Sequence, residues 1–208
     1  MIEGLGFLFS GMVFGLAAGI SPGPLIALVF SETIKYGKKE GFKIAFAPLI
    51  TDLPIILFVL LILSRLTKYD LVLGVITLFG AVYLIYLGVE NLRVKINKFE
   101  VKLEKRGALK RGIIANFLSP HPYLFWLFIG GPMVLKSLNM HVFATILFIL
   151  GFYSLLVGSK IGITLILDKF NSFTKNKYYI YIIRALGITL ILFALIFLKQ
   201  GIKLIGLF

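Results

Sequence analysis

The sequence Ser21-Pro22-Gly23-Pro24 interrupts an apolar segment that runs from Gly4 to Ile34, and Ser119-Pro120-His121-Pro122 interrupts a second segment from Gly112 to Leu135. A proline removes a backbone N–H and clashes with the carbonyl four residues before it, so two prolines within three residues end a helix. Backbone groups freed in this way cannot face lipid and must be buried in protein or line a wet cavity. The repeated S-P-x-P pattern therefore predicts two broken membrane helices.

The composition supports a membrane protein of a single transmembrane domain, residues 1–208. The chain is 59% hydrophobic and 15% charged, whereas an average soluble domain is about 45–50% apolar and about 25% charged. A spanning helix needs about 20 mostly apolar residues. Six segments qualify: Gly4–Ile34, Gly41–Leu63, Leu71–Leu92, Gly112–Leu135, Val142–Leu167 and Tyr179–Leu198. The chain has no cysteine, which excludes a disulfide scaffold, thiol catalysis and a Cys-held zinc site.

The net charge of +13 is unevenly placed. Of the 22 Lys and Arg residues, 16 follow the first, third and fifth segments, in or next to the loops 35–43, 93–111 and 168–178, and 5 lie on the other side. The positive-inside rule places these loops in the cytoplasm and both termini outside the cell membrane. The charge is thus explained by topology and by contact with anionic lipid, and a nucleic-acid partner is not expected.

The two interruptions also predict an internal repeat. Repeat one covers residues 1–92, the basic stretch 93–111 is a linker, and repeat two covers residues 112–208, with three spans in each repeat. Because three is odd, the second repeat enters the membrane from the opposite side, which is the inverted plan of many secondary transporters. New half-helices are expected from Leu25 and Tyr123, and their N-termini suit a carboxylate or another anion. The alternative for each break is a proline kink used for packing.

Asp52 and Lys160 are charged residues that lie well inside apolar segments. Asp52 lies about eleven residues from either end of the second segment, near mid-bilayer. A carboxylate there costs several kcal/mol unless it is paired, protonated or hydrated. It could accept a proton, hold a cation or bind a substrate ammonium, or it could be a protonated acid bonded to a neighbouring helix. Lys160 in the fifth segment could pair with Asp52 or extend to the cytoplasmic interface.

Other polar and small residues complete the predicted site. Asn116 should face the second break, and His121 could titrate near neutral pH or only form local hydrogen bonds. Glu90 and Arg93 are expected to form an interfacial pair. The predicted substrate-binding residues are Ser21, Pro22, Gly23, Pro24, Asp52, Asn116, Ser119, Pro120, His121 and Pro122, with Asp52 and Lys160 as candidates for ion coupling. No metal site or cofactor is predicted. Gly11, Gly15 and Gly19 form a smooth helix face for packing within or between subunits, which allows a homodimer.

These residues resemble one family. The matching stretches are Gly19-Ile20-Ser21-Pro22-Gly23-Pro24, Gly37-Lys38-Lys39-Glu40-Gly41, Asp52, Gly80-Ala81-Val82-Tyr83-Leu84-Ile85-Tyr86-Leu87-Gly88, and the stretch from Gly112 to Pro120 with Phe125-Trp126. Together they are similar to the LysE/RhtB amino-acid exporters over nearly the whole chain. The resemblance implies a secondary transporter that expels amino acids from the cytoplasm. Two sequences depart from the family pattern: Ser119-Pro120-His121-Pro122 replaces an Asn-Pro-Lys-like motif, and Ala47-Pro48 replaces glycine-rich sequence.

The sequence therefore predicts a non-enzymatic exporter of a small solute, expected to be an amino acid, that works by alternating access. The half-helix starts after Pro24 and Pro122 would hold the carboxylate, while Asp52 would bind the ammonium or exchange a proton. The wider superfamily is also similar to metal-cation exporters, so a divalent cation is the alternative substrate, although Ser21, Asp52, Asn116 and His121 form a thin ligand set. A membrane enzyme or a non-transporting subunit are the remaining alternatives. No nucleophile–base pair supports the former, and the latter leaves the two breaks unexplained.

Overall fold

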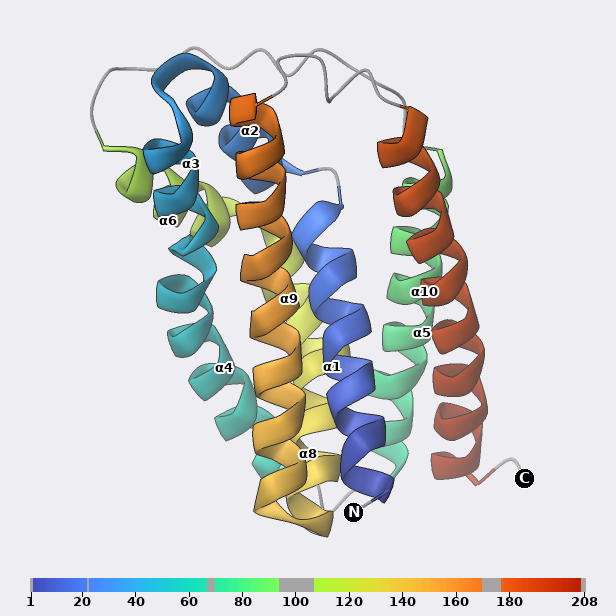
Figure 1. The fold of residues 1–208 in the computed structure, drawn as a ribbon. Coiled ribbons are helices and arrows are strands. Elements are labelled where there is room, and N and C mark those ends of the chain that lie inside the picture. Colours follow the sequence, from blue (N-terminus) through green and yellow to red (C-terminus); the bar gives the residue numbers. More distant parts are fainter. Residues whose placement is uncertain (1, 22, 67–69, 94–106, 170–176, 207–208) are drawn as a thin grey trace.

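The computed structural model describes the chain except residues 1, 22, 67–69, 94–106, 170–176 and 207–208. The described residues contain helices and no strand, so the predicted all-α class is confirmed. The elements are α1 (Ile2–Ile20), α2 (Pro24–Tyr36), α3 (Lys38–Ala45), α4 (Ala47–Leu66), α5 (Asp70–Leu92), α6 (Ala108–Leu118), α7 (Pro120–Phe125), the π-helix η1 (Trp126–Gly130), α8 (Gly131–Met140), α9 (Val142–Lys169) and α10 (Lys177–Leu204). The long helices run side by side, with the two ends of the chain at one end of the bundle and the α2–α3 turn at the other (Figure 1).

Six membrane spans can be built from these helices. By length and composition, four stretches can cross a membrane on their own: Lys38–Leu63, Leu71–Leu92, Val142–Asp168 and Arg184–Leu204. Two helix pairs qualify as bent spans, Gly4–Ile20 with Pro24–Tyr36 at 60° and Ala108–Leu118 with Pro120–Met140 at 54°. Both bends fall at the S-P-x-P sequences, as predicted.

Several predicted boundaries are wrong. Residues 35–43, expected to be a loop, are helical on both sides of Gly37, whose φ of +87° lies in the left-handed region that a side chain disfavours. A single glycine thus reverses the chain between α2 and α3. The predicted linker also ends too late, because α6 begins at Ala108. The prediction started both helices a few residues late because it followed the apolar runs, whereas the helices begin with polar sequence that includes the exposed Lys39 and Lys110.

Two helix pairs pack at close range through glycine. On α1, a Cβ atom at Gly11 or Gly15 would overlap a backbone carbonyl of α9, and one at Gly19 would overlap the Ser159 side chain. The predicted packing face is therefore confirmed within the subunit, so it no longer supports a homodimer. The same close approach joins α5 to α10, where a Cβ on Gly187 would lie 2.7 Å from the carbonyl oxygen of Gly88.

The outer surface of the bundle is apolar. Leu57, Phe58 and Leu61 of α4 and Leu192 and Leu195 of α10 are all more than half exposed. Soluble monomeric proteins rarely expose so many large apolar side chains, and this surface suits lipid. Several buried polar side chains, among them Asp52, Asn116 and Ser119, lie inside the bundle around the two helix breaks.

Candidate functional site

The two helix breaks place extended backbone in the middle of the bundle. Gly23 and Ser119 are both extended, and Pro24 and Pro120 open the helices that follow. Proline suits this first helical position because the N–H it lacks would have no helical partner. The half-helices thus begin one and three residues before the predicted Leu25 and Tyr123. The Ser119 hydroxyl caps α7 by accepting the N–H of His121 at 3.4 Å.

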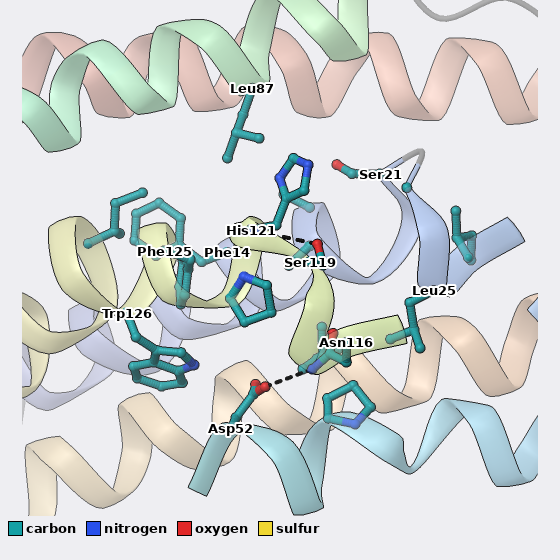
Figure 2. A pocket seen from close by; sticks show the side chains of 18 of the residues that line it. Phe14, Ser21, Leu25, Asp52, Leu87, Asn116, Ser119, His121, Phe125 and Trp126 are labelled. Atoms are coloured by element: carbon teal, nitrogen blue, oxygen red, sulfur yellow. Dashed lines mark hydrogen bonds between the residues drawn. The ribbon is translucent and has the colours of Figure 1, made fainter. Parts of the chain in front are cut away.

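A cavity of about 120 Å³ lies between these breaks. Figure 2 shows the two breaks meeting around it, with α4 on one side and α5 on the other. Of the residues predicted for substrate binding or coupling, the cavity is lined by Ser21, Gly23, Pro24, Asp52, Asn116, Ser119, His121, Pro122 and Lys160. Pro120 is not among its lining residues, and Pro22 lies outside the described residues.

Asp52 forms one end of the cavity and is held by donors from three helices. Its side chain is 4% exposed. Asn116 of α6 donates to Asp52 Oδ1 at 3.1 Å, and Tyr153 of α9 donates to Oδ2 at 3.4 Å. Thr51, beside it on α4, accepts from Asn116 at 2.6 Å and donates to Oδ1 at 3.4 Å. Hydrogen bonds of this kind stabilise a buried carboxylate in its charged form.

Trp126 adds a further donor to this end. The indole is fully buried, and its N–H points toward the Asp52 carboxylate (Figure 2). The indole N–H interacts with the Asp52 carboxylate, although among the described residues it forms no hydrogen bond of ideal geometry. Trp126 therefore adds a fourth side chain to the donors around Asp52.

Lys160 lines the cavity from α9 and is 2% exposed. Its Nζ donates to the carbonyl of Leu156, one helical turn earlier, at 3.4 Å. From the sequence, the Lys160 side chain could have extended to the cytoplasmic interface. In the structure it is buried, so it does not extend there. Asp52 and Lys160 interact electrostatically, but the described residues include no ion pair between them.

Different polar residues line the other end of the cavity. The Tyr83 hydroxyl of α5 lies 3.1 Å from His121 Nδ1. Ser21, at the first break, donates to Asn91 Oδ1 at 3.1 Å. Glu90 also lines the cavity, whereas the sequence placed it in an interfacial pair with Arg93. These contacts connect both breaks to α5.

Aromatic side chains form the apolar part of the wall. The Phe125 and Phe152 rings stack with centroids 5.0 Å apart, and the Trp126 ring meets Phe152 edge to face at 5.3 Å. Phe14 packs edge to face on Phe125 at 6.1 Å. Such pairs are rigid and keep the apolar wall in a fixed position.

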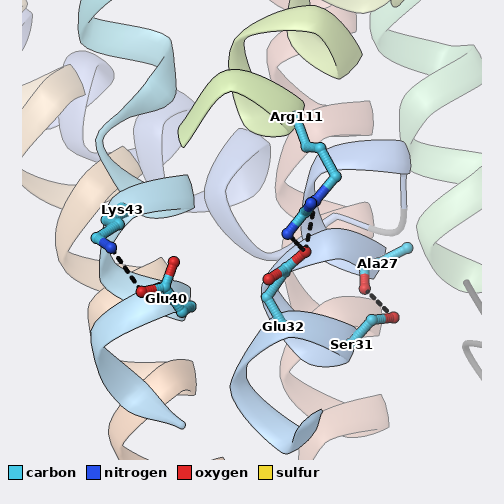
Figure 3. A network of polar contacts seen from close by, with 6 residues as sticks. All are labelled: Ala27, Ser31, Glu32, Glu40, Lys43 and Arg111. Carbon is cyan, nitrogen blue, oxygen red and sulfur yellow. Dashed lines mark hydrogen bonds and ion pairs between the residues drawn. The ribbon is translucent and has the colours of Figure 1, made fainter. Parts of the chain in front are cut away.

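A buried ion pair joins the two broken spans. Glu32 of α2 is fully buried, and its Oε1 accepts from Arg111 Nε at 2.7 Å and pairs with Arg111 Nη2 (Figure 3). Arg111 belongs to α6, which leads into the second break. The carboxylate therefore fixes the helix after one break to the helix before the other.

Residues 16–201 match the model of the family described as LysE type translocator. The chain belongs to this family. The chain is also similar to the "Putative amino acid efflux protein YcgF" of Bacillus subtilis, with 27% identity over 96% of this chain and 98% of that protein. It is 29% identical to the "Chemotactic transduction protein ChpE" of Pseudomonas aeruginosa over 62% of this chain and 66% of that protein. No solved structure matches the chain.

The family resemblance expected from the sequence is thus confirmed. A LysE type translocator is a multi-pass membrane protein that carries a small molecule, and the lipid-facing surface described above agrees with this.

Sequence reasoning missed several residues that line or support the translocator's cavity. Tyr83 and Trp126 belong to the stretches that carried the family resemblance, so a signal for them existed. Glu90 lies in an apolar segment, as Asp52 does, and could have been predicted as a cavity residue by the same argument. Nothing in the sequence distinguishes Tyr153 from the other tyrosines, because its role depends on packing between α4 and α9.

Proposed function

We propose that this LysE type translocator is a secondary transporter that exports an amino acid, with the cavity between the two breaks as its binding site. The observation that carries the proposal is Asp52, a buried carboxylate in the cavity wall that three neighbouring side chains hold in place. A carboxylate so positioned attracts a cationic group, and an amino acid supplies one in its ammonium. The efflux function named for YcgF supports the same substrate class.

An alternating-access mechanism is supported by how the helices pair. The α1–α9 pair and the α5–α10 pair each pack through glycine, and residues of both pairs line the cavity. The third main packing joins α4 to the α6–α8 span. Counted in chain order as six spans, the α1–α9 contact joins spans one and five, the contact of α4 with α6–α8 joins spans two and four, and the α5–α10 contact joins spans three and six. Exchanging repeat one (1–92) with repeat two (112–208) turns the contact between spans one and five into the contact between spans four and two. The same exchange leaves the contact between spans three and six unchanged. Inverted repeats would produce this pattern, and movement of one rigid pair against the other would open the cavity to either side.

The direction of transport and the energy source belong to the same proposal. The distribution of Lys and Arg supports placing the α2–α3 turn in the cytoplasm and both termini outside. A proton and a substrate ammonium would compete for the Asp52 carboxylate. Inward movement of a proton could then drive outward movement of the amino acid.

The test is transport by the purified protein in proteoliposomes with an imposed pH gradient. The panel contains the twenty common amino acids and Mn²⁺. We expect pH-driven transport of at least one amino acid and a loss of about tenfold or more in Asp52→Asn, because removing one charged hydrogen-bonded contact costs about 1.5–3 kcal/mol.

Asp168→Asn is the matched control. Asp168 makes a partly exposed ion pair with Lys38 at 3.2 Å and lies outside the cavity lining, so its variant should keep wild-type rates within about twofold. Undiminished pH-driven transport by Asp52→Asn would refute the role of Asp52. Transport of Mn²⁺ without any amino acid would support the metal-cation alternative instead.

A further inference from the structure

Lys160 is a buried charged residue of the cavity whose one hydrogen bond in the described part of the chain is to its own helix. We infer that its ammonium binds the carboxylate of the transported amino acid, so that the substrate is held as a zwitterion between Lys160 and Asp52. This assignment rests on the proposed function and adds to it the recognition of the second charge.

The first step is the unequal bonding of the two charges. The Asp52 carboxylate accepts hydrogen bonds from Thr51, Asn116 and Tyr153. An ammonium has three donors, yet Lys160 makes one long bond, 3.4 Å, to a carbonyl of its own helix. Two donors of a side chain that is 2% exposed therefore have no protein partner in the described part of the chain. The cavity that Lys160 lines is where an acceptor can reach them.

The second step is charge balance. A buried charge without a partner costs several kcal/mol. Asp52 and Lys160 carry opposite charges but form no ion pair of 4 Å or less among the described residues, so each remains open to another group. A zwitterion placed between them brings an ammonium to Asp52 and a carboxylate to Lys160 while adding no net charge. A simple amine or a simple acid would satisfy only one end.

The third step concerns the helix starts that the sequence favoured for the carboxylate. At the second break, Pro120 and Pro122 have no N–H, and the N–H of His121 is accepted by Ser119. The helix that begins there continues through η1 and α8 to Met140, but two of the first three residues of its first turn are prolines. The N-terminus at this break therefore has few free donors to offer. Lys160 places its Nζ donors at the same cavity.

The experiment uses pairs of probes that differ only in the carboxylate. L-leucine and L-leucinol share an ammonium and a side chain suited to the aromatic wall, and L-lysine with L-lysinol provides a basic pair. Binding is read from the fluorescence of Trp126, the single tryptophan of the chain and a lining residue of the cavity. Transport of each probe is measured in the same proteoliposomes.

Wild-type protein should prefer an amino acid over its amino alcohol by about tenfold or more. Lys160→Met keeps the length of the side chain and removes the charge, so it should weaken amino-acid binding about 10- to 100-fold and leave the amino alcohol within about threefold. Lys160→Arg should retain most of the preference because it keeps a cation. Lys136→Met, at an exposed lysine, is the matched control and should behave as wild type.

Each other outcome overturns the assignment. An equal loss of both members of a pair in Lys160→Met would mean that Lys160 acts in folding or in the transport cycle and not on the carboxylate. Unchanged preference would mean that another group binds it. Wild-type transport of an amino acid and its amino alcohol at equal rates would refute the role of Lys160 while the proposed function stands. Failure of the proposed function itself would appear as no amino-acid transport in the full panel.

Discussion

Removal of the Arg111 side chain should destabilise the protein far more than removal of an exposed cation. Arg111 Nε and Nη2 both contact Glu32 Oε1, while Oε2 has no partner among the described residues. The Glu32 side chain is 0% exposed and that of Arg111 is 23% exposed. In Arg111→Met, the carboxylate stays buried and loses the side-chain donors that it has among the described residues. A buried charge left without its partner costs about 3–5 kcal/mol, and this is the expected decrease in the free energy of unfolding.

The reverse and double substitutions separate the pair from the rest of the side chain. Glu32→Gln leaves Arg111 charged but partly hydrated, so we expect a smaller loss of about 1–3 kcal/mol. Glu32→Gln with Arg111→Met removes both charges and should be more stable than Arg111→Met alone. Such a recovery identifies the loss as the cost of an isolated charge and not of lost packing.

The assay is SDS titration of the purified protein in mixed micelles, followed by circular dichroism. Lys43→Met is the matched control, because Lys43 and Glu40 on α3 form an exposed pair at 2.5 Å (Figure 3). An exposed pair contributes about 0–1 kcal/mol, so this variant should unfold close to wild type. Equal effects of Arg111→Met and Lys43→Met, or no recovery in the double variant, would refute the reasoning.

Two further predictions concern packing and orientation. Gly15→Ala should lower the unfolding free energy by about 1–3 kcal/mol, because its Cβ would overlap the Phe152 carbonyl; Gly6→Ala, where nothing lies within 4 Å, should have no measurable cost in the same SDS titration. Lys39→Cys and His141→Cys each introduce one thiol into a cysteine-free chain at an exposed position. An impermeant maleimide added to intact cells should label His141→Cys and leave Lys39→Cys unlabelled, and the opposite result would reverse the proposed orientation.

Much of the fold could be predicted because its signals are local. Each S-P-x-P sequence breaks a helix whatever surrounds it. Six long apolar segments in one chain are typical of helices that span a bilayer. The glycine spacing of Gly11 and Gly15 likewise predicts a smooth face from one helix alone. The identity of the partner helix, α9, depends on tertiary packing and could not be read from that spacing.

The site was predictable in part for the same reason. Asp52 stood out because a carboxylate in an apolar segment needs an explanation in any fold. The direction of the Lys160 side chain was left open, since a lysine seven residues from a helix end can extend outward or turn inward. Only the packing of α9 against its neighbouring helices decides between these two. Tyr153 and Glu90 depend in the same way on which helices meet around the cavity.

The two polar clusters of the interior differ in a way that matters for a transporter. Glu32 and Arg111 contact each other directly and join α2 to α6. Asp52 and Lys160 both border the cavity without direct contact. If these two had closed into an ion pair, a substrate would have to break it before binding, and the desolvated pair would resist that exchange by several kcal/mol. Keeping the charges apart, with Asp52 held by neutral donors, leaves both available to a ligand that carries opposite charges at its two ends. A closed pair suits a fixed joint between two helices, whereas a separated pair suits a site that binds and releases a ligand.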